Sequence, residues 1–508
     1  MMKRRLCLLM VMVSVLSLLS FGCGKQKVSD GDSSNKDTLV IAYQDEAESL
    51  DCHATSTNQA EKMAANIYAS LLKFDDNYTP QPYVAKSWEI SDDKLTYTFE
   101  LRDDVVFHDG HKMTVADVEY SFKRAMDSPF TACYCETFKE VKAVGDNSFQ
   151  ITLKAPYAPL LNVLCEPFLG IVYEDAVKAK GDKFGQEPIG CGPYKVKEWI
   201  PGTHILLEAH DKFFGGVAPI KYIKVVSIPD PSTKLISLEN GQVDVADSIA
   251  SNNRQTVIDN DELVLLEAPS AKYAYFGFNN EKELFKNLKL RQAINCAINK
   301  EAVIQIAMEG IAEPSTCTLC EKCFGFPSSL KGYEYNVEKA KQLLVESGLK
   351  DVKFEVICKD ETGKKIAEAI QSDLKAIGIE ISVLTLEAGG YYDRFDKCDF
   401  EAFYGTWSDS LMDPDPIVGM RYKSTYTGSA GNFIWLKNDK VDQLIDSART
   451  EGDTEKRKAM YEEMLQYVSD QAYEVPLFYF LYNLGANKSV KNIKALPTGI
   501  YYYNTWSF

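Results

Sequence analysis

Three carboxylates stand close together in the stretch GTWSDSLMDPDPIVG, residues 405–419: Asp409, Asp413 and Asp415. Such a group can hold a metal ion, act as a pair of catalytic acids, or form the wall of a binding pocket. A calcium loop needs acids at alternating positions, a central glycine and a final glutamate, and this stretch lacks that pattern. A glycosidase needs two carboxylates flanking a scissile bond, a geometry that sequence spacing does not define. The surrounding elements decide between these roles.

Cysteines and histidines form two further candidate metal sites. Cys317, Cys320 and Cys323 resemble the start of an iron–sulfur cluster motif, but the fourth cysteine and its following proline are missing. We expect a loop that is pinned by a disulfide or holds free thiols, with a zinc or cluster site as the alternative. His108 and His111 flank an Asp-Gly turn, which predicts a solvated hairpin rather than a metal site. No metal or cofactor is therefore assigned.

Catalytic motifs are absent from the sequence: neither G-x-S-x-G, nor H-E-x-x-H, nor a Walker A motif occurs. With 508 residues, 45% of them hydrophobic, the chain can bury several cores. Its net charge of −17 disfavours contact with nucleic acid phosphates and anionic lipid headgroups. We therefore expect several globular units and no nucleic acid partner.

The N-terminus has the pattern of an export signal. The basic MMKRR precedes an apolar run, Leu6 to Leu19, which is too short to span a bilayer. Cys23 ends this pattern and a polar stretch follows, which resembles a bacterial lipoprotein signal in which the cysteine is lipidated. We expect a signal peptide at 1–22 and a lipid-anchored flexible tether at 23–37; the alternative is an ordinary secretory signal with a chance cysteine.

Strands and helices are mixed along the rest of the chain. Alternating apolar residues predict strands at 95–101 and 273–280, and helical spacing predicts a helix within 57–73. Thr114 and Asp117 form a capping-box pattern at the start of a helix over 115–125. A strand, a helix and a strand over 353–384 predict a βαβ unit. Ser232 is expected to cap a short helix that stops at Gly241. This order indicates an α/β fold.

Five ordered segments carry a family resemblance. They are AKSWEISDDKLTYTFELRDDVVFHDGHKMTVADVEYSFKRAMD (85–127), PIGCGPYKVKEW, IPDPSTKLISLENGQVDVAD, YFGFNNEKELFKNLKLRQAINCAINKEAVI and YNVEKAKQLLVESG. Together they resemble the family 5 extracellular solute-binding proteins, the oligopeptide- and dipeptide-binding lipoproteins of ABC importers. The resemblance runs from about residue 38 to the C-terminus.

The resemblance implies a bilobed, type II periplasmic-binding-protein-like fold with an extra inserted domain. Lobe I would be discontinuous, with domain II inserted into it and lobe III following, and the lobes would close on a ligand around crossing segments near 272–275 and 477–482. The implied boundaries are 38–70, 170–272 and 480–508 for lobe I, 71–169 for domain II and 273–479 for lobe III.

The implied function is capture of a peptide and its delivery to the permease and ATPase subunits of an importer. The protein would be a monomer and not an enzyme, anchored by Cys23 to the outer face of the bacterial cell membrane, in the periplasm if the host has two membranes. A non-peptide ligand such as a metal chelate or an oligosaccharide is the alternative, and a secreted hydrolase is the remote one.

Ligand-binding residues also follow from the resemblance. The family's Trp-to-DPD segment lines the cleft, so Asp413 to Asp415 is expected to be a structural turn and Trp407 a ligand platform. Peptide-binding members hold the ligand's ammonium with an aspartate three residues after the tryptophan; Ser410 stands there, with Asp409 beside it. Tyr404 replaces an arginine that some members carry. The expected set is Trp407, Asp409, Ser410, Tyr404, Gly405, Ala47, Glu48, Ser248 and Tyr479.

Overall fold

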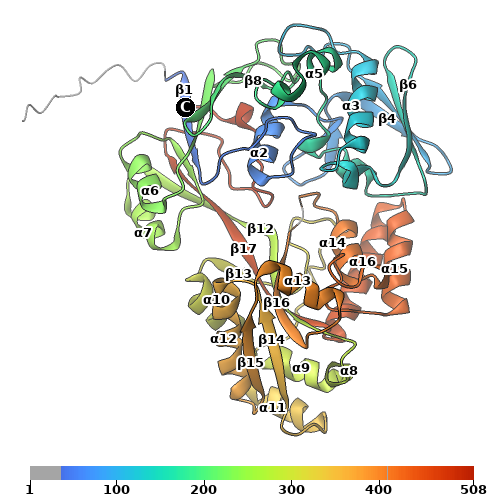
Figure 1. Cartoon of the computed structure of the whole chain (residues 1–508), viewed down its shortest axis with the longest axis vertical. Helices are drawn as coiled ribbons and strands as arrows, with labels where there is room; N and C mark the ends of the chain where they lie inside the picture. The colour runs from blue at the N-terminus through green and yellow to red at the C-terminus, as the bar shows by residue number, and fades with distance from the viewer. Residues whose placement is uncertain (1–35, 409) are drawn as a thin grey trace, which may run out of the picture. The chain divides into compact units, whose positions relative to one another are not determined.

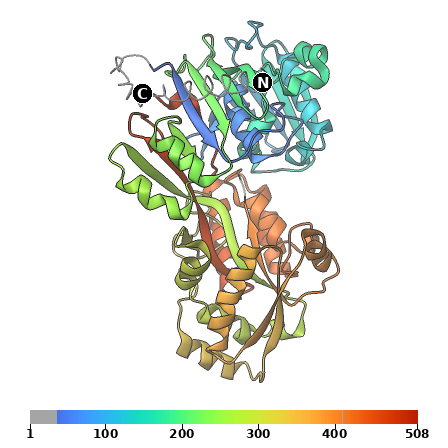
Figure 2. The same cartoon turned by 60° about the vertical axis from the view of Figure 1, so that its left-hand side comes forward.

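The computed structural model describes residues 36–408 and 410–508 (Figures 1 and 2). Cys23, the predicted signal peptide and most of the predicted tether lie outside these residues. Residues Thr38–Phe508 form one compact unit. Within the described residues, no helix combines the length and the apolar character that crossing a membrane requires.

An 11-stranded mixed sheet is the largest sheet of the described chain. Parallel pairs join β1 to β10 and β14 to β15, whereas the pairs of β12 with β16 and with β17 are antiparallel. In spatial order the strands are β15 (Glu380–Thr385), β14 (Lys353–Cys358), β16 (Ala402–Trp407), β12 (Leu263–Phe278), β17 (Glu474–Asn487), β11 (Val245–Asp247), β1 (Thr38–Tyr43), β10 (Tyr222–Ser227), β9 (His204–Ala209) and β8 (Tyr194–Ile200), with β13 (Ala312–Pro314) on β17.

The two longest strands of this sheet, β12 and β17, pair with each other from Leu263 opposite Asn487 to Gly277 opposite Glu474. Figures 1 and 2 show both running from the elements around β1 to those around β14. The segments expected to cross between lobes, 272–275 and 477–482, lie inside these strands. The ladder shifts register between Pro269 and Tyr273. The domain boundaries themselves stay a prediction.

A separate four-stranded sheet has the order β4 (Ala85–Ile90), β5 (Thr96–Leu101), β7 (Ser148–Leu153) and β6 (Phe138–Val144). The predicted alternation is confirmed, because Tyr97, Phe99 and Leu101 are buried. Helix α3 (Val115–Asp127) packs on this sheet and begins with the predicted capping box of Thr114 and Asp117. Strands β2 (Leu72–Phe74) and β3 (Pro80–Pro82) form a small hairpin.

The predicted βαβ unit is confirmed as β14, α12 (Glu361–Lys375) and β15, with both strands parallel. Its apolar face is buried, as expected for residues three to four apart on one side of a helix. Helices α15 (Asp439–Thr450) and α16 (Thr454–Asp470) lie against each other (Figure 1). The other helices of this half are α8 (Glu283–Lys286), α9 (Leu288–Ala297), α10 (Lys300–Met308), α11 (Val337–Glu346), α13 (Ala388–Asp396) and α14 (Pro414–Tyr422).

The helix predicted within 57–73 is confirmed as α2 (Asn58–Ile67), which ends before β2 begins at Leu72. The predicted cap of a second helix was wrong. The cap of α6 (Pro231–Glu239) is Asp230 rather than Ser232: Pro231 lacks an N–H and suits the first helical position, so the residue before it caps. The remaining elements are α4 (Leu160–Val163), α5 (Glu174–Lys180), α7 (Ser251–Asp259) and the 3₁₀ turns Ala132–Cys135, Pro167–Leu169, Gly181–Gly185, Ser424–Tyr426 and Tyr503–Thr505.

Candidate functional site

A cavity of about 660 Å³ lies between segments that are far apart in the sequence. One wall comes from the end of β1, the start of α2 and the end of β11; the other comes from residues 408–426 and the C-terminal stretch 497–500. This volume lies within the range of about 300–1,000 Å³ that small-molecule sites occupy. The cavity is therefore the candidate ligand site.

Two of the predicted ligand residues line this cavity: Ser248 after β11 and Ser410 after β16. Ala47 is buried and Glu48 is exposed, and neither is among the described residues that line it. Asp409 lies outside the described residues. The structure thus brings together only part of the predicted set.

The other predicted residues belong to the sheet beside the cavity. Trp407 ends β16 opposite Tyr273, is half-buried, and packs edge-on against Phe433 with ring centroids 6.1 Å apart. Tyr404 and Gly405 are buried in the same strand. Tyr479 donates its hydroxyl to the carbonyls of Cys317 and Leu319, at 2.9 and 2.6 Å. Among the described residues, none of these four is part of the cavity lining.

The carboxylates of the DPD turn already have partners. Asp413 caps α14 by accepting from the Asp415 N–H at 2.9 Å, and the Arg457 guanidinium donates to both of its oxygens, at 2.7 and 2.6 Å. Asp415 lines the cavity and accepts from Arg449 at 2.9 Å. Burial raises the pKa of Asp415, and Arg449 opposes that rise. This agrees with the expected structural turn.

The cysteine loop is buried. Cys317 donates its thiol to the Leu319 carbonyl at 3.6 Å, and burial raises the pKa of Cys317 to about 11. A buried thiol of raised pKa is a poor nucleophile and a poor metal ligand until it is deprotonated. The potential ligand atoms of Cys317, Cys320 and Cys323 are not gathered as closely as those of a second group described next.

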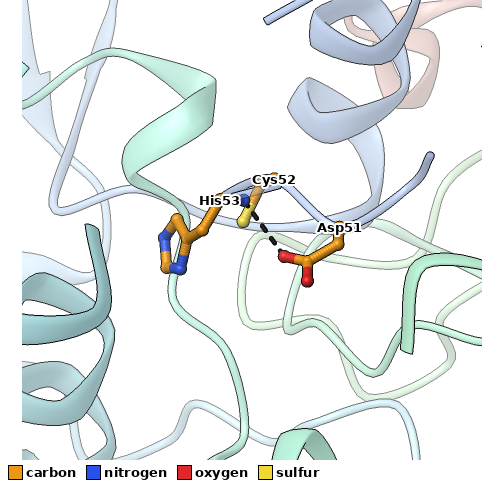
Figure 3. Close-up of side chains that lie close together, drawn as sticks. All are labelled: Asp51, Cys52 and His53. Atoms are coloured by element: carbon orange, nitrogen blue, oxygen red, sulfur yellow. Dashed lines mark hydrogen bonds between the residues drawn. The ribbon is translucent and has the colours of Figure 1, made fainter. Parts of the chain in front are cut away.

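That second group, Asp51, Cys52 and His53, was not singled out from the sequence (Figure 3). Their potential ligand atoms lie within 4.8 Å of one another, and all three residues are buried. Arg124 donates to both carboxylate oxygens of Asp51, at 2.7 and 2.5 Å, and the His53 N–H donates to one of them at 3.1 Å. Burial lowers the pKa of His53 to about 3. The Arg124 guanidinium already neutralises the Asp51 carboxylate and would repel a metal ion. The group of Asp51, Cys52 and His53 is therefore structural.

The histidine hairpin differs in part from the prediction. His111 is exposed, as expected. His108 is instead half-buried: its Nδ1 accepts from the Gly190 N–H at 3.2 Å and its Nε2 donates to the Gly192 carbonyl at 3.2 Å. Burial lowers the pKa of His108 to about 3, so this imidazole is a neutral packing group.

Charged residues line the candidate cavity in a mixed pattern. Lys62 pairs with Asp247 at 2.6 Å, and Arg449 pairs with Asp415. Lys272 also lines the cavity, and among the described residues no carboxylate oxygen lies within 4.0 Å of its ammonium. Burial lowers the pKa of Lys272, with nearby Lys359 adding to this effect. Lys272 is therefore a cavity cation without a carboxylate partner in the part of the chain that the structure describes.

Two further cavity groups have unsatisfied polar atoms. Gln59 Nε2 and Asp247 Oδ1 are buried and have no hydrogen-bond partner among the described residues, on side chains that are 7% and 5% exposed. Buried polar atoms are nearly always paired, so two unpaired atoms on one cavity wall indicate a polar ligand. Sequence reasoning missed Gln59, Asp247 and Lys272, because nothing in their local sequence marks a cavity.

Known proteins of similar sequence and fold bind different ligands. The chain is 28% identical to heme-binding protein A of Haemophilus influenzae over 85% of each chain, and 26% identical to oligopeptide-binding protein AppA of Bacillus subtilis over 98% of this chain and 97% of that one. It is similar to the structure of HbpA2 from Haemophilus parasuis, with a TM-score of 0.87 and 25% identity, covering 92% of this chain and 99% of that one.

A second similar structure is the ABC transporter-associated periplasmic binding protein DppA from Helicobacter pylori in complex with the peptide STSA. Its TM-score is 0.74 at 27% identity, covering 92% of this chain and 98% of that one. The family model described as "Bacterial extracellular solute-binding proteins, family 5 Middle" matches residues 79–429, more than half of the chain. The protein therefore belongs to the family 5 bacterial extracellular solute-binding proteins.

Proposed function

We propose that this protein captures peptides for an ABC importer and delivers them to its permease and ATPase subunits. The observation that carries the proposal is the cavity wall with unpaired Gln59 Nε2 and Asp247 Oδ1. A peptide offers amide N–H and C=O groups at regular spacing, which suit such atoms. Relatives whose names state peptide ligands, AppA and DppA, support the same choice.

Lys272 gives this ligand a charged contact. Its ammonium has no carboxylate partner among the described residues, and a peptide's terminal carboxylate would supply one. Ser248 and Ser410 would hydrogen-bond the peptide backbone from opposite walls. Ala47, Glu48 and the end of β16 at Trp407 stay our proposed edges for an extended ligand, and Asp409, Tyr404, Gly405 and Tyr479 stay proposed ligand residues from the sequence.

Capture by a protein of this kind is a shift between conformations. A ligand that bridges two walls stabilises the closed form by the difference between its contacts in the closed and the open form. This role requires neither a cofactor nor a catalytic residue, and we propose that the protein acts as a monomer without enzymatic activity. A metal chelate is the rival ligand, because a structure 28% identical to this chain is NikZ from Campylobacter jejuni in complex with Ni(L-His).

Mass spectrometry of the ligand that co-purifies with the native protein tests the proposal. We expect peptides, released on unfolding in amounts close to one per protein. A metal chelate or an oligosaccharide in their place would replace the peptide assignment and leave the transport role. Turnover of the bound ligand by the purified protein would contradict the binding-protein role itself.

The membrane anchor is proposed from the sequence pattern that ends at Cys23. A diacylated Cys23 would hold the protein on the outer face of the cell membrane, since two acyl chains anchor far more firmly than one. Cys23→Ser should release the protein into the medium or the periplasm, as measured by cell fractionation and metabolic labelling with palmitate. Unchanged membrane association, without label in either protein, would contradict lipidation.

A further inference from the structure

A second cavity of about 380 Å³ lies beside the candidate ligand cavity. Its walls come from four segments that are far apart in the sequence: the loop at 76–78 between β2 and β3, the β12 residues Ala268 and Pro269, the cysteine loop at 320–322, and the C-terminal stretch at 494–497. We call this cavity the outer chamber. Its volume is more than half that of the candidate ligand cavity and lies within the range of about 300–1,000 Å³ that small-molecule sites occupy.

A small connecting cavity of about 80 Å³ lies between the two larger ones. It shares lining residues with both: Ser410, Thr498 and Ile500 with the candidate ligand cavity, and Asp76, Tyr78 and Leu496 with the outer chamber. Glu166 also lines it, is 2% exposed, and accepts a hydrogen bond from the Ser410 hydroxyl at 3.3 Å. The three cavities therefore follow one another along one path.

Tyr78 lines both the connecting cavity and the outer chamber. Its φ is +59°, in the left-handed region that bulky side chains rarely adopt. The Asp75 carboxylate accepts from the N–H groups of Asn77 and Thr79, at 2.8 and 3.0 Å, and so holds this turn. The Tyr78 ring packs against Phe74, with ring centroids 5.6 Å apart. Strained residues that are held in this way cluster at functional sites, and this one stands where two cavities meet.

The Tyr78 hydroxyl can bond to a ligand at this junction. Its oxygen is buried and has no hydrogen-bond partner in the part of the chain that the structure describes. Burial raises the pKa of Tyr78 to about 12, and Thr498, which lines the candidate ligand cavity, acts in the opposite direction. The phenol therefore keeps its proton at neutral pH and can donate one hydrogen bond and accept another. Because buried polar atoms are nearly always paired, this oxygen indicates that a polar group belongs beside it.

The buried and half-buried residues of the outer chamber are apolar, apart from the Tyr78 hydroxyl and the Cys320 thiol. Four of them form its apolar surface: Ala268, Pro269, Leu496 and Pro497. Its four charged residues are all exposed: Asp76, Glu321, Lys322 and Lys494. The ion pair of Asp76 with Lys494, at 2.8 Å, joins two of the walls. A chamber with an apolar inner surface and charges at its rim suits an apolar side chain.

We propose that the outer chamber is a second subsite, which takes one bulky apolar residue of the peptide that extends past Tyr78 from the candidate ligand cavity. This inference rests on the proposed function and specifies which peptides the protein selects. The Tyr78 hydroxyl would bond the backbone of the residue that reaches the junction. Burial of the apolar side chain removes its surface from water, so a peptide that carries one at the right position binds more tightly.

Competitive retention of synthetic peptides by the full-length protein tests the subsite. The probes are peptides of three to six residues built from alanine and serine, with phenylalanine placed at each position in turn, so that all of them carry the same charges. We expect the wild type to retain one positional isomer roughly tenfold or more over the others of its length. Ala495→Trp fills the outer chamber from its half-buried C-terminal wall and should abolish this advantage, while peptides without phenylalanine are still retained.

Ala179→Trp is the matched control, because it adds the same bulk at an exposed position of α5 that lines none of the three cavities. Equal retention of all isomers, or an advantage that survives Ala495→Trp, would overturn the subsite while leaving peptide capture intact. Retention of no peptide of any length would defeat the proposed function, and the subsite with it.

Photo-cross-linking to the wild type supplies a second readout, which decides the question should Ala495→Trp not fold. The photoreactive residue p-benzoylphenylalanine replaces phenylalanine at the favoured position, and mass spectrometry of tryptic fragments identifies the residues that it labels. We expect labelling at 268–269 or 320–322, which line the outer chamber and not the candidate ligand cavity. Labelling confined to residues of the candidate ligand cavity, such as Tyr134 and Tyr157, would contradict a ligand group in the outer chamber.

Discussion

The buried charges around α14 and α16 and those at the cavity wall differ in how completely they are paired with groups of opposite charge. Around α14 and α16 each buried carboxylate meets an arginine: Asp413 with Arg457, and Glu474 with Arg421 beneath the ring of Tyr275. At the cavity, Lys272 has no carboxylate oxygen within 4.0 Å among the described residues, and Asp247 Oδ1 is buried without a hydrogen bond from the described residues. The cavity also holds complete pairs, Lys62 with Asp247 and Arg449 with Asp415, so the groups that a ligand can complete are the ones beside them that lack a partner.

The largest effect should come from breaking a complete pair. Arg457→Met leaves Asp413 buried and 1% exposed without its cation, which should cost about 3–5 kcal/mol in the free energy of unfolding. Urea denaturation followed by fluorescence measures this loss. Lys456→Met, at the exposed neighbouring position, should change stability by less than about 0.5 kcal/mol. A loss below about 1 kcal/mol for Arg457→Met would contradict the comparison.

A smaller effect is expected from Lys272, and it should be limited to peptide affinity. Lys272→Met should weaken a peptide with a free terminal carboxylate by about 1.5–3 kcal/mol and should hardly affect the same peptide when it is amidated. Titration calorimetry of the two peptides against both proteins makes the comparison. Equal losses for the two peptides would mean that Lys272 contributes packing against Phe480 rather than charge.

The smallest effect should be a change of slope with pH at Glu166. Its pKa is raised in the folded state, so above the usual value near 4.5 the unfolded carboxyl ionises while the folded one keeps its proton. The folded state then binds more protons, and stability falls as pH rises. Glu166→Gln should flatten this fall in the ligand-free protein, as measured by thermal unfolding between about pH 5 and pH 8. A variant whose curve parallels the wild type would show that Glu166 is ionised in the fold.

Local signals made much of the fold predictable from sequence. The capping box at Thr114 and Asp117, the alternation along β5 and the βαβ unit around α12 each depend on residues within one or two turns of each other. Where prediction failed, as at the cap of α6, a neighbouring proline changed which residue takes the position.

The site was predictable only where a family motif marks it. Ser248 and Ser410 were expected and line the cavity, whereas Glu166 reads as an ordinary loop acid in CEPFLG. Glu166 accepts a hydrogen bond from Ser410, which is 244 residues away in the chain. Contacts over such separations are set by tertiary packing, and sequence spacing carries no record of them. Lys272 lies within β12, and nothing in its local sequence marks it as a residue of a cavity wall.

The register shift in β12 has a mechanical consequence. A continuous ladder of backbone hydrogen bonds resists bending, and an interruption gives the ribbon a point of compliance. Between Pro269 and Tyr273 the ladder with β17 is interrupted, and the Ala271 N–H instead donates to the Pro497 carbonyl at 2.9 Å. Ala271 and Lys272 both line the cavity at this point. Bending of the two long strands at this interruption would therefore move residues that line the candidate cavity, so that the shape of the strand pair and the shape of the cavity depend on the same few residues.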